Sequence, residues 1–242
     1  MTNAFIKKLS IHIRVLLPLL AGTILCLLGT HYIREETGRY LYTFLGWNMF
    51  LAWLPVLFSF LLDVYVEQNK SRQLLNSFIV ICLGILWLLF YPNAAYLITD
   101  LIHPVAQYIK PSDILMKKDM LFWVHLLSFF LAAVIGILLS YFSLYTVHCL
   151  VRNIYGKVTG WLFAIIVLLL SSFGIYVGRF VRWDSWDMLT QPFKLIQETI
   201  EMLTTATQLN HIMGFSFLIF CCTMFGYWFL SVFVDSKSQP TS

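Results

Sequence analysis

The chain has 242 residues, of which 60% are hydrophobic and only 12% are charged, and its formal net charge is +4. Soluble domains carry about 25% charged residues, so lipid must solvate most of this chain. Its 16 Lys and Arg residues are spread along the sequence, which argues against the clustered basic face of a nucleic-acid-binding protein.

Six apolar runs are long enough to cross a hydrocarbon core of about 30 Å, which takes about 20 helical residues. They cover residues 15–33, 41–62, 74–97, 121–148, 160–181 and 212–234. The first run is longer than the core of a signal peptide and lacks a small-residue cleavage site, so we expect it to be retained. The sequence therefore predicts an all-α transmembrane bundle of six spans, forming a single domain over residues 1–242, with a disordered tail at residues 235–242.

The longest connector, which follows the fifth run, contains a periodic segment. Its apolar residues recur at helical spacing, at Phe193, Ile196, Ile200 and Leu203, and polar residues fill the other side. Pro192 suits the first turn of a helix. We predict an amphipathic helix over about residues 192–206 that lies on the membrane surface or caps the bundle.

The orientation of the bundle is predicted from the charged residues of its connectors. Lys and Arg divide equally between the two sides, so the usual inside bias gives no answer. The first helix usually dominates, and it is preceded here by Lys7, Lys8 and Arg14. We therefore predict that both termini are cytoplasmic.

Polar residues that are costly in a bilayer gather at one end of the bundle. In six alternating spans, the ends of spans 1, 3 and 5 share a face with the starts of spans 2, 4 and 6. We predict one polar binding cluster on that face, formed by Asn48, Asn93, Tyr96, Asp100, His103, Arg179, Arg182, Asp184 and Asp187.

Proline and glycine residues shape the helices that carry this cluster. Pro92 removes a backbone hydrogen bond, so the third helix should bend or end nearby. Pro104 disfavours helical geometry at the preceding residue, His103. Gly174 and Gly178 form a small-xxx-small pair that lets another helix approach closely.

Three separated segments resemble the family of predicted bacterial membrane proteins called domain of unknown function 1361. They read WNMFLAWLP at 47–55, FYPNAAYLITDLIH at 90–103 and GIYVGRFVRWDSWD at 174–187. The sequence departs from the family pattern at Ala95, where the family has Pro, and at Asp184, where it has Asn. The resemblance implies a multi-pass protein of the bacterial plasma membrane and no established activity.

The predicted binding cluster has three interpretations. Arg–Asp pairs could staple helix ends together, or the paired arginines could clamp an anion such as a lipid headgroup. A metal could be held by Asp100, His103 and His125 with Asp184 or Asp187, although the nearby arginines would repel it. We therefore predict no metal, no cofactor and no catalytic residue, and enzymatic and non-enzymatic roles both stay open.

Among these roles, we favour a structural or assembly protein of the cell envelope. One alternative is an intramembrane enzyme or binding protein that acts on a lipid or a lipid-linked anionic substrate at the outer face. A second alternative is a small transporter. The expected partners are membrane lipid and an anionic lipid headgroup, and no nucleic acid is expected.

Overall fold

A computed structural model describes residues 3–38, 42–68, 78–108, 120–183 and 190–238 of the chain. Within these ranges the secondary structure is helical and contains no strand. Six helical segments are long and apolar enough to cross a membrane: Ile13–Thr37, Thr43–Gln68, Phe78–Ala106, Met120–Tyr155, Lys157–Val181 and Thr207–Val234. The predicted all-α fold with six spans is confirmed.

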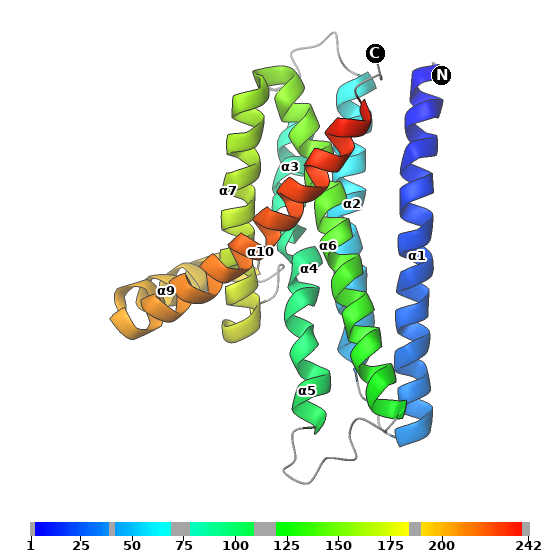
Figure 1. Ribbon diagram of the computed structural model, residues 1–242. Coiled ribbons are helices and arrows are strands. Elements are labelled where there is room, and N and C mark those ends of the chain that lie inside the picture. The colour runs from blue at the N-terminus through cyan, green and yellow to red at the C-terminus, as the bar shows by residue number, and fades with distance from the viewer. Residues whose placement is uncertain (1–2, 39–41, 69–77, 109–119, 184–189, 239–242) are drawn as a thin grey trace.

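The longest helix, α6 (Met120–Tyr155), is the centre of the bundle. Its first half packs against α1 (Asn3–Thr37) and α2 (Thr43–Gln68) around a buried core that includes Leu45 and Phe129. Its second half packs against α7 (Lys157–Tyr176), in a second core that includes Trp87 and Leu144. Figure 1 shows α6 between these neighbours.

The third span is broken into short helices. The helix α3 (Phe78–Phe90) ends just before Pro92, where α4 (Pro92–Tyr96) begins, and this confirms the predicted interruption. A 3₁₀ segment, η2 (Leu97–Leu101), and α5 (Ile102–Tyr108) follow. His103 is therefore helical, contrary to our expectation, because Pro104 lies in the first turn of α5, where a missing N–H breaks no helical hydrogen bond.

A single glycine separates the fourth and fifth spans. The ends of the predicted apolar runs had indicated a longer connector, at residues 149–159. The helix α6 continues to Tyr155, and α7 begins at Lys157. Gly156 turns the chain between them with a φ of +92°, a conformation that L side chains rarely adopt. The two helices then pack side by side as an antiparallel hairpin (Figure 1).

The predicted amphipathic helix forms as α9 (Pro192–Thr204), which runs across the direction of the bundle helices (Figure 1). The last helix, α10 (Ala206–Ser238), packs mainly against α7. It continues past Val234, so our predicted disordered tail starts inside a helix. The carbonyls of the last apolar turn can accept hydrogen bonds from the next four N–H groups, which extends the helix into polar sequence.

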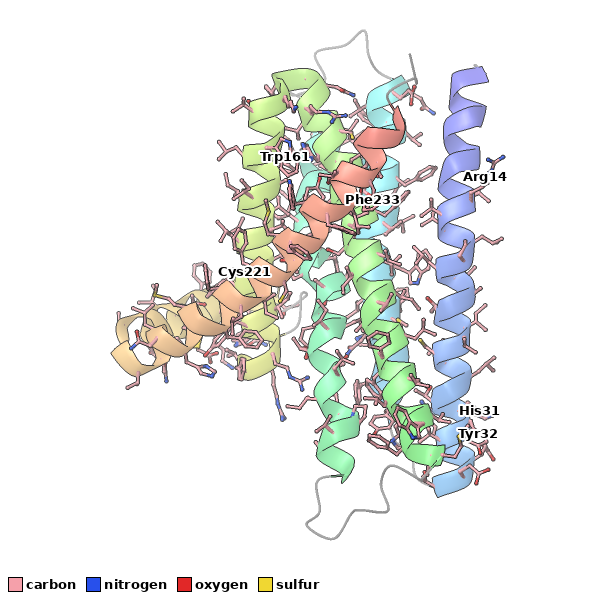
Figure 2. All side chains as sticks on the ribbon, viewed as in Figure 1. Arg14, His31, Tyr32, Trp161, Cys221 and Phe233 are labelled. Atoms are coloured by element: carbon pink, nitrogen blue, oxygen red, sulfur yellow. The ribbon has the colours of Figure 1, made fainter. Side chains whose placement is uncertain are left out.

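The outer surface of the bundle is apolar along much of its length. On α10, Cys221 and Phe233 are exposed, and both are labelled in Figure 2. The start of α1 and the end of α10 lie at the same end of the bundle (Figure 1), as an even number of spans requires.

Candidate functional site

A buried carboxylate, that of Asp100, joins three spans. It lies in η2 and is only 1% exposed. The Asn48 amide, from α2, donates to its Oδ2 over 2.9 Å. The Arg179 guanidinium donates to its Oδ1 over 3.3 Å. The ends of the third and fifth spans are therefore in contact, as alternation of the spans predicts.

His103 completes this group, one helical turn after Asp100. Its Nε2 lies 3.3 Å from Arg179 Nη1 and 3.5 Å from Asp100 Oδ1. A guanidinium only donates and a carboxylate only accepts, so this nitrogen accepts from Arg179 when it carries no proton and donates to Asp100 when it carries one. The rings of Phe44 and Phe129 pack against the imidazole, with centroids 4.7 and 6.0 Å away. We call Asn48, Asp100, His103 and Arg179 the polar cluster.

The backbone that presents Arg179 is a π-helical turn. This segment, η4 (Val177–Val181), extends α7. It closes with a hydrogen bond from the N–H of Arg182 to the carbonyl of Val177, at 3.1 Å. Arg182 then ends the helix with a left-handed φ of +63°. Single π turns of this kind occur often at functional sites.

A cavity of about 500 Å³ lies beside the polar cluster. It opens between α3, α4 and α7, and α9 borders it. Apolar side chains form most of its wall, including Leu89, Phe173 and Ile175. Two residues on its rim, Ile85 and Leu170, are 58% and 51% exposed on the outside of the bundle. The cavity therefore opens sideways, toward the space that lipid would occupy.

The polar side chains that line the cavity are all uncharged: Asn48, Tyr91, Asn93, Tyr96, Ser171, Trp183 and Thr199. Over the described part of the chain, no Asp, Glu, Lys, Arg or His contributes to the wall. Asn48 belongs to both features, since it lines the cavity and donates to Asp100. The cavity and the polar cluster are thus adjacent, with the charges held outside the cavity wall.

The glycine pair allows α4 to approach α7 closely. A Cβ on Gly174 would lie 3.0 Å from Pro92 Cγ, and a Cβ on Gly178 would lie 3.4 Å from Tyr96 Cε2. The helix that approaches this pair is therefore α4.

Asn93 compensates the break at Pro92. The N–H of Ala94 donates to the Tyr91 carbonyl at 3.4 Å. The Phe90 carbonyl instead accepts the Asn93 side-chain amide at 3.0 Å. The side chain of Asn93 therefore replaces a helical hydrogen bond, as well as lining the cavity.

Side chains after η4 hold α9 against the cavity, and the sequence did not predict this contact. The indole N–H of Trp183 donates to Glu198 Oε2 over 2.8 Å. The Lys194 ammonium lies 5.5 Å from the centroid of the same indole and 3.9 Å from Glu198. Leu195 of α9 contributes to the cavity wall. We call the Trp183–Glu198 hydrogen bond, together with Lys194, the α9 latch.

The structure brings together part of the predicted binding cluster. Asn48, Asp100, His103 and Arg179 are in contact, and Asn93 and Tyr96 line the cavity next to them. Arg182 is exposed, whereas Arg179 contacts the buried Asp100. Asp184 and Asp187 lie outside the described residues.

The metal interpretation combines His125 with either Asp184 or Asp187, and both aspartates lie outside the described residues. His125 faces Tyr42, with its Nδ1 3.2 Å from the phenol oxygen. Across the described residues, no group of three or more His, Cys, Asp or Glu side chains is arranged to hold a metal ion.

The chain matches a known protein family. No curated protein and no solved structure matches the chain. The family model described as "Protein of unknown function (DUF1361)" matches residues 47–222. This range contains the polar cluster, the cavity and the α9 latch. The chain is therefore a member of the DUF1361 family of integral membrane proteins.

Proposed function

We propose that this protein binds a membrane lipid by holding an apolar chain of the lipid in the cavity between α3, α4 and α7. The observation that carries the proposal is the sideways opening of an apolar cavity between membrane-spanning helices, at Ile85 and Leu170. Its volume of about 500 Å³ lies within the usual range of ligand sites, about 300–1,000 Å³. A lipid could enter from the bilayer without crossing water.

Binding is favoured over catalysis by the chemistry of the wall. The described lining residues include no acid, base or cysteine thiol, whereas hydrolysis or group transfer needs a general base or an activated nucleophile. The guanidinium of Arg179 and the imidazole of His103 engage the buried Asp100.

The membrane placement is also part of the proposal. With a cytoplasmic N-terminus in a bacterial plasma membrane, the polar cluster lies in the outer leaflet. The amphipathic α9 then lies along the interface with Phe193 and Ile200, both exposed, toward the acyl chains. Arg182 is exposed and does not line the cavity, so it would contact the headgroups of surrounding anionic lipids.

A structural role in the cell envelope is the second candidate, and one observation favours it. Asp100 is paired with Arg179 and hydrogen-bonded to Asn48, so the cluster staples three spans together. This role needs no occupant in the cavity, and the two functions therefore predict different results when lipid contacts are mapped.

Photo-crosslinking tests the two candidates. The protein is placed in nanodiscs with a phospholipid that carries a diazirine at the end of an acyl chain, and the labelled peptides are identified by mass spectrometry. Lipid binding predicts labelling at Ser171 and Ile175, which line the cavity and are 4% and 1% exposed. Lipids on the outer surface cannot reach them, so a lack of label there would leave the structural role.

A matched pair of variants shows whether the label arrives through the opening. Ile85→Trp narrows the rim, whereas Ile81→Trp changes an exposed residue one turn earlier in α3 that does not line the cavity. We expect Ile85→Trp to reduce labelling of Ser171 severalfold and Ile81→Trp to leave it unchanged. Equal labelling in both variants would contradict entry at this rim.

A further inference from the structure

Asn48 presents a hydrogen-bond acceptor to the cavity. Its amide contacts Asp100 Oδ2 at 2.9 Å. A carboxylate paired with arginine only accepts, so the contacting atom of Asn48 is the NH₂ nitrogen, and the orientation of the amide is fixed by chemistry. Asp100 is in turn held by Arg179. The polar cluster therefore decides which end of the Asn48 amide remains for a ligand.

That remaining end is the carbonyl oxygen, Oδ1. Within the described part of the chain, no group donates to it, although Asn48 is half-buried and lines the cavity. This oxygen can therefore accept a hydrogen bond from a molecule in the cavity. An occupant that carries an O–H group near Asn48 would supply the donor.

Charge restricts the occupant further. The polar groups of the described wall are amides, hydroxyls and an indole, and none of them is ionised. Moving a phosphate, carboxylate or ammonium group into such a cavity without a partner of opposite charge costs several kcal/mol in any apolar medium. A hydroxyl group needs only one acceptor, which Asn48 provides.

We propose that the cavity selects an uncharged lipid alcohol, an apolar chain that ends in a free hydroxyl, and that Asn48 is the residue that recognises the hydroxyl. This inference rests on the proposed lipid binding and names the class of lipid. The hydroxyl donates to Asn48 Oδ1, and the chain lies along the apolar wall toward Ile85 and Leu170.

Competition against the acyl-chain photoprobe tests this inference. Labelling of Ser171 is measured in nanodiscs with added dodecanol, dodecane, dodecyl phosphate or 1-methoxydodecane, which keeps the oxygen but has no O–H. We expect half-inhibition by dodecanol at a concentration about fivefold lower than for the other three, as one hydrogen bond would give. Equal competition by the methyl ether or by dodecyl phosphate would overturn the inference.

Farnesol, added in the same experiment, separates two sources of such alcohols. Stronger competition by farnesol than by dodecanol would assign the site to branched isoprenoid alcohols, and the reverse would assign it to straight-chain ones. Either result supports recognition of the hydroxyl, provided that 1-methoxydodecane remains a weaker competitor than dodecanol.

The variant Asn48→Leu removes the acceptor and keeps a similar side-chain volume. We expect dodecanol and dodecane to compete equally in this variant, with dodecane unchanged from the wild type, which also reports that the cavity is intact. A retained preference for dodecanol would overturn the role of Asn48. If the variant does not fold, the comparison of dodecanol with 1-methoxydodecane in the wild type still tests whether the cavity recognises the hydroxyl. Absence of any label at Ser171 in the wild type would instead contradict lipid binding itself.

Discussion

The guanidinium of Arg179 lies 3.3 Å from the carboxylate of Asp100, and the carboxylate is only 1% exposed. The contact ties the end of the fifth span to the end of the third, and Asn48 adds the second span. A buried carboxylate that loses its partner keeps the cost of desolvation and loses the attraction that offset it. The pair should therefore matter more through the penalty of breaking it than through its net strength.

Removing the arginine should destabilise the protein strongly. We expect Arg179→Met to lower the free energy of unfolding by about 3–5 kcal/mol, the usual result of leaving one buried charge unpaired. Adding Asp100→Asn to this variant should recover much of the loss, because it neutralises the remaining charge. The measurement is denaturant unfolding in detergent micelles, with Arg14→Met, at an exposed position on α1 (Figure 2), as the control. A double variant no more stable than Arg179→Met would contradict this account.

A second prediction concerns the contact between α4 and α6. A Cβ on Gly136 would lie 2.3 Å from the Ala94 carbonyl oxygen and 3.0 Å from Leu97 Cβ. Because these are backbone and near-backbone atoms, the helices must separate, and we expect Gly136→Ala to cost about 1–3 kcal/mol. Gly84→Ala is the matched control, since nothing lies within 4 Å of its Cβ, and it should be neutral or slightly stabilising. Equal melting temperatures for the two variants would refute the prediction.

The sequence was sufficient for the six spans and for much of the polar cluster. A run of about 20 apolar residues identifies a membrane span even when its packing against other helices is unknown. Alternation then places Asp100 and Arg179 on one face. Their direct contact depends also on the approach of α4 to α7 at Gly174, which the small-xxx-small spacing indicates.

The cavity and the α9 latch could not be predicted, because they depend on how helices cross. Ile85 and Ile81 are both exposed apolar residues of α3, yet only Ile85 borders the cavity. Nothing in the sequence spacing of Trp183 indicates its hydrogen bond to Glu198. The prediction that His103 is not helical was wrong because a proline disfavours the middle of a helix but suits its first turn. The local sequence did not show that α5 begins at Ile102, just before Pro104.

A third prediction concerns the hairpin between α6 and α7. Gly156 has a φ of +92° and a ψ of 169°, a region of backbone conformation that is almost restricted to glycine. We expect Gly156→Ala to lower the free energy of unfolding by about 1–3 kcal/mol through backbone strain. Gly214→Ala, within α10 and with open space around its Cβ, is the control and should have little effect. Unchanged thermal unfolding of Gly156→Ala would show that the connection relaxes without cost.

The α9 latch should control access to the cavity from water. Trp183→Phe keeps an aromatic ring but removes the N–H that donates to Glu198, so α9 should separate from the bundle more often. Thr199 lines the cavity from α9, and Thr199→Cys, in a chain whose own cysteines are replaced by alanine, provides a reactive thiol at this position. We expect Trp183→Phe to raise its rate of alkylation by a water-soluble maleimide about fivefold, as loss of one hydrogen bond would allow.

The control for this measurement is a second glutamate on the same helix. Glu201 is exposed and accepts a hydrogen bond only 3.2 Å long from Gln197, also on α9, so Glu201→Gln perturbs the helix without touching the bundle. The alkylation rate should stay at its starting value in this variant. A similar increase with Glu201→Gln would mean that α9 loosens by itself. An unchanged rate with Trp183→Phe would mean that packing of Leu195 against the cavity wall, and not the hydrogen bond, holds α9 in place.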